Sequence, residues 1–107
     1  MFYNSLPSID LHGENKDSAR VLIEEFIRDN IKLRNNKLII IHGIGTGILK
    51  NEVHSVLKKN KNVISYKIDF FNPGCTIVEI KTIIWQIMIK VLKYKAFERG
   101  TLYVWRW

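Results

Sequence analysis

Apolar and polar residues along the first part of the chain predict a strand followed by a helix. Residues 8–12 form a short apolar segment that ends at Gly13, as is typical of a strand that leads into a turn. Asn15 can cap the helix that follows. Apolar residues recur there at the three- and four-residue spacing of one helical face, at Ala19, Leu22, Ile23, Phe26 and Ile27.

A second unit of the same kind comes next. Residues 37–42 form a near-continuous aliphatic run, as is expected of a strand inside a sheet. After a glycine-rich stretch, apolar residues again recur at helical spacing, at Leu49, Val53, Val56 and Leu57. The two strands are predicted to be parallel, because the first helix supplies the crossover connection that a parallel pair needs.

The following segment predicts a pair of antiparallel strands. Apolar and polar residues alternate from residue 64 to residue 70, so the apolar set is expected on one face of a third strand. That set is Ile64, Tyr66, Ile68 and Phe70. An Asn-Pro-Gly turn follows, and residues 76–80 form a fourth strand, antiparallel to the third because only about five residues connect them. Residues 8–80 thus predict an α/β fold, a two-layer βαβαββ sandwich with a four-stranded mixed sheet.

Residues 81–107 form a basic, aromatic C-terminal extension to a domain at residues 6–80. Helical spacing predicts a third helix with polar positions at Gln86, Lys90 and Lys93 and a wide apolar face. We expect this helix to pack on the sandwich, with a short strand after it. The alternatives are that it lies on a membrane, binds a partner, or stacks its aromatic side chains on unpaired bases. Those side chains are Trp85, Tyr103, Trp105 and Trp107.

The charge of the chain indicates a polyanionic partner. The 107 residues are enough for one domain, and they hold 17 Lys and Arg against 10 Asp and Glu, a net charge of +7. Residues 1–80 carry a net +2 and residues 81–107 a net +5, so the basicity belongs mainly to the extension. Nucleic acid and an anionic membrane surface both fit such a charge.

Cysteine content and hydropathy favour a cytoplasmic protein. Cys75 is the single cysteine, which excludes an internal disulfide and fits a reducing compartment, and we interpret it as a buried small side chain. The N-terminal residues lack the basic and apolar segments of a secretory signal. No apolar run approaches the ~20 residues of a spanning helix, so a membrane partner is not expected.

Two strand ends carry the candidate chemistry. The sequences IDLHG at residues 9–13 and IIIHG at residues 39–43 each end a strand with His-Gly and each lead into a helix. Parallel strands joined by a crossover end at the same edge of a sheet, so His12 and His42 are expected near one another and beside two helix N-termini. Gly43, Gly45 and Gly47 allow an anion to approach backbone N–H groups without a Cβ in the way, which indicates a phosphate site.

The polar residues around these boxes suggest acid–base chemistry. Asp10 and His12 are two residues apart on a strand, where a carboxylate can orient an imidazole. Lys50 follows the glycines and adds positive charge. No cysteine pair or HExxH pattern indicates zinc, but Asp10 could instead recruit a divalent cation such as magnesium. His54 is interpreted as a solvated residue of the second helix, with contact to backbone phosphates as the minor alternative.

These motifs closely resemble those of the Smr (small MutS-related) domain. Its signatures are an LDLHG box and an HGxGxG box, which match residues 9–13 and 42–47, and residues 72–80 look like its closing strand. The resemblance covers residues 6–80. Lys50 stands where the family usually has arginine, which keeps the charge but loses the bidentate fork. Residues 81–107 match no feature of the family.

The resemblance implies a fold and a class of activity. The fold would be like that of the C-terminal domain of bacterial translation initiation factor three, and the activity would be endonucleolytic cleavage of RNA or of branched DNA, with the ribosome as a candidate partner. Asp10 and His12 correspond to family residues implicated in cleavage. Residues of the second box are implicated in binding and activity, which here are His42, Gly43, Gly45 and Gly47. The alternative is a nucleic-acid binding module that does not cleave.

Overall fold

The computed structural model describes residues 6–98, and side chains up to residue 94. The elements in chain order are β1 (Ser8–Asp10), α1 (Lys16–Lys32), β2 (Lys37–Ile41), α2 (Ile48–Lys59), β3 (Val63–Ile68), β4 (Cys75–Ile80) and α3 (Ile83–Glu98). This order confirms the predicted βαβαββ arrangement and the C-terminal helix. The short strand expected after that helix lies outside the described residues.

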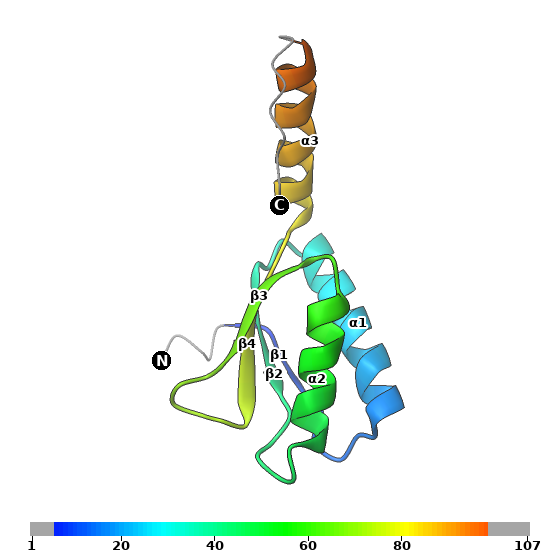
Figure 1. Cartoon of the computed structure of the whole chain (residues 1–107), viewed down its shortest axis with the longest axis vertical. Coiled ribbons are helices and arrows are strands. Elements are labelled where there is room, and N and C mark those ends of the chain that lie inside the picture. The colour runs from blue at the N-terminus through cyan, green and yellow to red at the C-terminus, as the bar shows by residue number, and fades with distance from the viewer. Residues whose placement is uncertain (1–5, 99–107) are drawn as a thin grey trace.

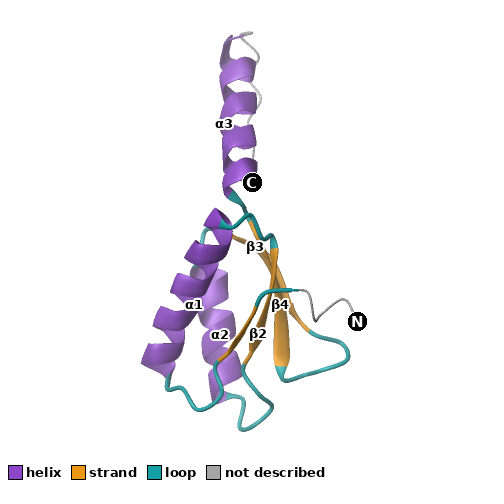
Figure 2. Ribbon diagram, turned by 180° about the vertical axis from the view of Figure 1, so that it is seen from behind, coloured by secondary structure: helices purple, strands orange, loops and turns teal. Residues whose placement is uncertain are grey.

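The four strands form one mixed sheet in the order β1-β2-β4-β3. β1 and β2 are parallel, as α1 connects them, and β4 runs antiparallel to both of its neighbours, β2 and β3. Figure 1 shows α1 and α2 side by side, and Figure 2 shows the same two-layer arrangement from behind. The crossover brings the ends of β1 and β2 to the same edge of the sheet, where Asp10 is level with Ile41.

The core lies between the two helices and the inner face of the sheet. Because side chains alternate along a strand, every second residue of β2 and β4 points inward, and these residues are fully buried. They are Leu38, Ile40, Val78 and Ile80, with Thr76 as the polar member of the same face. The helices contribute Ala19, Ile23, Ile27, Val53, Val56 and Leu57. Burying each large side chain stabilises the fold by about 1.5–3 kcal/mol.

The expected alternation in the third strand is wrong at Ile64. A β-bulge between Val63 and Ser65 shifts the register, so Val63 and Tyr66 pack against the core while Ile64 is half exposed. Phe70 lies beyond the strand and is 91% exposed. An extra residue in the bulge changes which side chains face inward, and the alternation of apolar residues alone does not reveal it.

The expected packing of α3 on the sandwich is also wrong. In Figure 1 this helix projects away from the domain along the long axis of the molecule, and its large apolar side chains are exposed. They are Ile83, Ile84, Ile87, Met88, Val91, Leu92 and Tyr94. Two residues separate β4 from α3, and the N–H of Lys81 donates to the Asn62 carbonyl at 2.8 Å, so α3 starts at the end of the sheet and continues away from it. Within residues 6–98, no helix combines the length and the apolar character needed to cross a membrane.

Candidate functional site

The first box ends in an exposed turn. Glu14 N–H donates to the Leu11 carbonyl at 3.0 Å, and Gly13 has a φ of 83°, which makes residues 11–14 a type II turn that needs glycine at its third position. Both Asp10 and His12 are exposed. Asp10 Oδ1 accepts a hydrogen bond from the backbone N–H of His12 at 2.9 Å. The carboxylate therefore fixes the main chain of the turn, whereas the sequence suggested that it orients the imidazole.

The N-terminus of α1, just after this turn, is capped by side chains. Asn15 Oδ1 accepts from the N–H of Ser18 at 2.8 Å, and the Ser18 hydroxyl donates to Glu14 Oε2 at 2.7 Å. The cap that the sequence predicted at Asn15 is confirmed. The cap satisfies one of the N–H groups that a helix start leaves without a partner.

The second box is tied to the β3–β4 turn. The N–H groups of His42 and Gly43 both donate to the carbonyl of Gly74, at 2.9 and 3.0 Å. A Cβ on Gly74 would lie 3.4 Å from the Cα of Gly43, so the two glycines allow a close approach of the two backbones. The final turn of the sheet thereby positions the start of the glycine loop, residues 43–47.

The glycine loop leads into a helix start without a cap. Gly47 is the N-cap residue of α2, has a φ of 83° and makes no side-chain cap hydrogen bond. The first helical bond after it runs from Asn51 N–H to the Gly47 carbonyl at 2.9 Å. Within the described part of the chain, the N–H groups of residues 44–50 donate to no protein acceptor. Of these groups, those of the first turn of α2 lie at the positive end of the helix dipole and can receive an anion.

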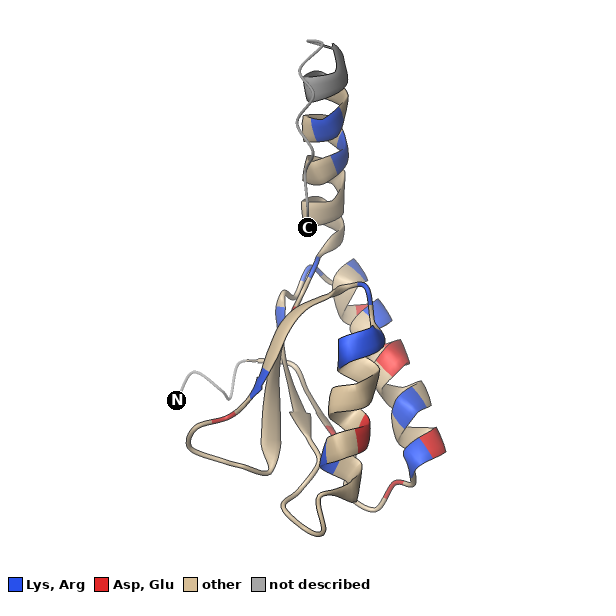
Figure 3. Cartoon of the chain, viewed as in Figure 1, with Lys and Arg blue, Asp and Glu red and all other residues tan. Residues whose placement is uncertain are grey.

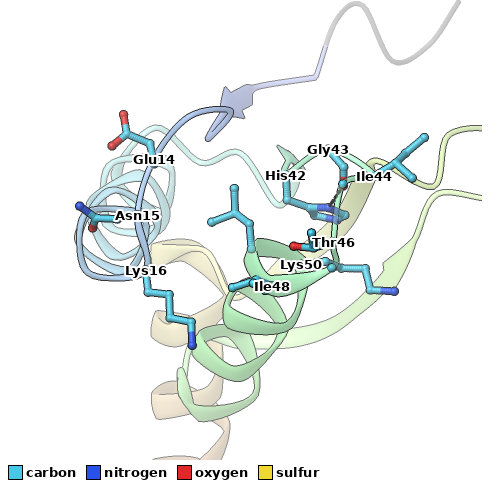
Figure 4. Close-up of a pocket in the computed structure, with 12 residues that line it drawn as sticks. Glu14, Asn15, Lys16, His42, Gly43, Ile44, Thr46, Ile48 and Lys50 are labelled. Carbon is cyan, nitrogen blue, oxygen red and sulfur yellow. Dashed lines mark hydrogen bonds between the residues drawn. The ribbon is translucent and has the colours of Figure 1, made fainter.

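A cleft of about 390 Å³ opens at this helix start. One side is formed by Glu14, Asn15 and Lys16 at the start of α1, and the other by residues 42–50 (Figure 4). The structure thus brings together five predicted phosphate-site residues, His42, Gly43, Gly45, Gly47 and Lys50. Asp10 and His12 do not line the cleft. They lie beside it, because Asp10 is paired with Ile41, the residue directly before His42.

Space above the glycines is open. A Cβ built on Gly43, Gly45 or Gly47 meets no atom within 4 Å. A side chain there would project into solvent, where an approaching ligand would come to lie. All three have positive φ, at 82°, 20° and 83°, so the loop needs glycine for its backbone conformation as well.

His42 belongs to a hydrogen-bonded chain behind the cleft. It is 5% exposed, its Nδ1 lies 2.8 Å from the Gly43 carbonyl, and its Nε2 lies 2.8 Å from the Thr76 hydroxyl. A carbonyl can only accept, so Nδ1 carries the proton, and in the neutral ring Nε2 accepts from Thr76. The Thr76 oxygen also lies 2.9 Å from His54 Nε2, which must then donate to it. The Gly43 carbonyl therefore sets the tautomer of His42, and the Thr76 hydroxyl sets that of His54.

The interpretation of His54 as a solvated residue is wrong. The centre of its ring lies 5.2 Å from that of Tyr66 in β3, and the side chain is partly buried. Burial lowers the pKa of His54 below its ordinary 6.5, and the nearby His42 and Lys50 lower it further. The lowered pKa favours the neutral ring, and the hydrogen bond to Thr76 places its proton on Nε2.

Sequence reasoning missed Thr76 and His54 as partners of the second box. A signal for Thr76 was present, because it precedes the buried Val78 and Ile80 at two-residue spacing and so shares their inward face. A threonine on an apolar inner face needs a hydrogen-bond partner. His54 is adjacent in sequence to the buried Val53, but its distance from Thr76 depends on how α2 lies on the sheet.

Cys75 lies on the opposite face of the sheet from His42. It is buried, as predicted, and burial raises the pKa of its thiol, with further contributions from Asp69 and Asp10. A thiol that holds its proton is a weak nucleophile, so Cys75 is not suited to covalent chemistry. Among residues 6–98, no three His, Cys, Asp or Glu side chains form a group that could hold a metal ion.

Comparisons with known proteins agree with this geometry. The sequence model of the Smr domain matches residues 9–81. The chain is 36% identical over 76 residues to "Endonuclease MutS2" of Alkaliphilus metalliredigens and 34% identical over 79 residues to that of Halothermothrix orenii, which covers 68% and 71% of this chain. In each case the match spans only 10% of the relative's length.

Two solved structures share the fold. The Smr domain of Thermus thermophilus MutS2 superposes with a TM-score of 0.68 at 24% identity, over 70% of this chain and 98% of that one. YdaL, a stand-alone small MutS-related protein from Escherichia coli, superposes with a TM-score of 0.65 at 21% identity, over 68% of this chain and 63% of that one. With the family model, the two sequence boxes and the sheet order in agreement, the chain belongs to the Smr domain family.

Proposed function

We propose that this chain binds the phosphate backbone of a nucleic acid in the cleft at the start of α2 and cleaves phosphodiester bonds with Asp10 and His12. The observation that carries the proposal is the row of N–H groups at residues 44–50, which donate to no acceptor in the described chain and belong to a loop whose three glycines have open space at Cβ. Anions bind to such a helix start through these donors and through the helix dipole.

The cleft suits a phosphate better than an apolar ligand. Its charged lining residues are Lys16 and Lys50, on opposite sides, with one carboxylate, Glu14, whose Oε2 accepts from Ser18. Two ammonium groups add attraction for a phosphate, and this attraction weakens as salt concentration rises. None of these contacts reads a base, so binding is expected to depend little on sequence.

Cleavage is assigned to the exposed turn beside the cleft. A strand whose phosphate sits at the start of α2 passes the end of β1, where both side chains reach solvent. His12 can take a proton from the attacking oxygen as general base, since its imidazole is exposed at the turn. Asp10 Oδ1 accepts from the backbone N–H of His12 and so holds the turn that presents this histidine. Among the described residues Oδ2 has no hydrogen-bond partner, and it can contact the reacting groups. The N–H groups of α2 stabilise the charge that develops on the phosphate.

The names of the relatives support the same class of activity. The proteins from Alkaliphilus metalliredigens and Halothermothrix orenii are called endonucleases, although this chain corresponds to a tenth of their length. We propose RNA, with the ribosome as a candidate partner, or branched DNA as the substrate, and the cytoplasm as the location. No catalytic step is assigned to a metal ion, and a comparison of cleavage with magnesium and with EDTA measures whether magnesium is needed.

A non-catalytic binding module is the second candidate. One observation favours it: Asp10 directs an oxygen to the main chain of the turn and not to the His12 imidazole. In that case the box would have a structural role, and the cleft alone would carry the function.

The deciding experiment incubates the purified chain with structured RNA, ribosomes and branched DNA, with magnesium or with EDTA. The proposal expects cleavage of at least one substrate by the wild type. Gly45→Val, which places a side chain over the cleft, should weaken binding to every sequence alike, whereas Lys32→Gln on the far end of α1 should not. Binding without cleavage selects the second candidate, and binding that Gly45→Val leaves unchanged removes the cleft from the proposal.

A further inference from the structure

A second concave surface lies where α3 leaves the domain. It has a volume of about 320 Å³, and we call it the basic groove. Its lining residues are Lys61, Asn62, Lys81, Trp85, Gln86, Ile89, Lys90 and Lys93. Four of these eight carry ammonium groups, and no carboxylate is among them, so the groove attracts anions.

The fold fixes the shape of this groove at its base. Lys81 N–H donates to the Asn62 carbonyl at 2.8 Å, and Gln86 Nε2 donates to Asn62 Oδ1 at 3.3 Å, so the start of α3 is attached to the segment before β3. The Lys81 ammonium lies 5.2 Å from the centre of the Trp85 ring, a cation–π distance that holds this charge at the groove.

The two sides of α3 differ in chemistry. The side turned toward the domain presents Lys90 and Lys93 to the groove together with Trp85 and Ile89, whereas the exposed large apolar residues occupy the other side. Lys90 and Lys93 lie about one helical turn apart and both line the groove, so both ammonium groups are available to a phosphate backbone. A flat bilayer cannot enter a concave space between a helix and a domain, so the groove fits a strand better than a membrane.

The groove and the cleft lie at opposite ends of α2. The helix begins at the cleft with Ile48 and ends at Lys59, two residues before Lys61 of the groove. Figure 3 shows the glycine loop at one end of the domain and the lysines of α3 beyond the other. Twelve residues of helix span about 18 Å, which equals roughly five base steps of a strand whose bases stack at the duplex rise of about 3.4 Å.

We propose that the basic groove is a second contact for the nucleic-acid strand that the cleft binds, reached only by strands that extend more than about five nucleotides past the cleft. This inference rests on the proposed function of the cleft. Under this proposal, residues 81–93 make affinity depend on strand length, because short strands bind in the cleft alone and longer strands contact both surfaces.

The test compares 5-nucleotide and 20-nucleotide single strands by fluorescence anisotropy over a range of salt concentrations. The variant is Lys81→Gln/Lys90→Gln/Lys93→Gln. The wild type should bind the long strand more tightly and with a steeper salt slope, and the variant should lose up to about 2 from the slope for the long strand alone, at about 0.7 per contact. Its affinity for the short strand should stay the same.

The matched control is Lys32→Gln/Lys37→Gln/Lys67→Gln, which removes the same charge at positions outside the groove. An equal loss in both triple variants would mean general charge attraction and would overturn the groove. The groove is also overturned if the groove variant binds the long strand as tightly as the wild type does, while Gly45→Val abolishes binding of the short strand. The groove is also overturned if the same three lysines are needed for sedimentation with phosphatidylserine vesicles but not for strand binding. A wild type that binds neither strand refutes the cleft itself.

Discussion

The two His-Gly boxes have nearly the same sequence and opposite structural roles. In the first, His12 is exposed, the turn is fixed by the Asp10 carboxylate, and Asn15 caps the helix that follows. In the second, His42 is buried in a hydrogen-bonded chain, and the helix start after Gly47 is uncapped. The first box therefore presents side chains to solvent, and the second presents backbone donors.

This difference shows how one fold can separate chemistry from binding. A buried histidine holds the glycine loop through the Gly43 carbonyl, and the N–H groups of the first turn of α2 donate to no acceptor among the described residues. The exposed imidazole of His12 can reach a substrate. Changes at equivalent positions of the two boxes should thus affect different measurements.

The largest effect is expected at the first box. Asp10→Ala and His12→Ala should each reduce cleavage by about 10²- to 10⁴-fold while affinity stays within a few fold, because these groups act on the transition state. Single-turnover cleavage and equilibrium binding measure the two quantities. Asp17→Ala, which removes an exposed carboxylate of α1, is the control and should leave both unchanged. Full activity in both variants would end the catalytic assignment.

The next effect concerns the burial of the second histidine. Thr76→Val keeps the shape of the side chain but leaves His42 Nε2 without a partner in the core, at a cost of about 1–3 kcal/mol in the free energy of unfolding. Thr76→Ser keeps the hydroxyl and should recover most of that loss. Urea unfolding followed by circular dichroism gives both values. If valine leaves the stability unchanged and serine lowers it, the methyl group and not the hydrogen-bonded chain stabilises the box.

A matched pair of glycines compares the boxes directly. Gly13 and Gly47 both have a φ of 83° and open space at Cβ, so alanine at either position should cost about 1–2 kcal/mol of stability. Only Gly47→Ala should weaken nucleic-acid binding, by roughly tenfold, because its methyl group enters the anion site. Equal losses of affinity in the two variants would show that the boxes do not differ in this respect.

The smallest effect is on pH dependence. The pKa of His54 is lowered from 6.5, so the unfolded chain binds a proton more readily than the folded chain does. The stability that neutral His54 supplies is present above pH 6.5 and decreases as the pH falls below that value toward the folded pKa. The stability difference between wild type and His54→Gln should therefore shrink between pH 7.5 and pH 5.5 in urea unfolding. A constant difference would mean that His54 does not titrate across this range.

Most of the fold could be predicted from the sequence, because long periodic segments carry a strong signal. The stripe of α1 from Ala19 to Ile27 and the aliphatic run of β2 fix those elements, and the short connection between β3 and β4 requires an antiparallel pair. The bulge at Val63 and the direction of α3 could not be predicted in this way. Both depend on local backbone geometry that apolar spacing does not record.

The parts of the site that consist of backbone groups could be predicted from the sequence. The glycine loop and its helix start follow from local sequence, since positive φ and a missing cap are properties of single residues. The partners of His42 do not follow, because Thr76 is 34 residues away and His54 belongs to another element. Asp10 was placed on the correct strand, but which hydrogen bond it makes depends on the turn that Gly13 allows.

The row of unpartnered N–H groups also determines how the protein exchanges its amide hydrogens. Amides that donate to no acceptor exchange with deuterated solvent without any opening of the fold, whereas those that follow Asn51 in α2 exchange only after local unfolding. Residues 44–50 should therefore label within the first time point of an exchange experiment, next to a helix that stays protonated. A bound phosphate would slow these amides first, so occupancy of the cleft can be measured residue by residue without any label on the ligand.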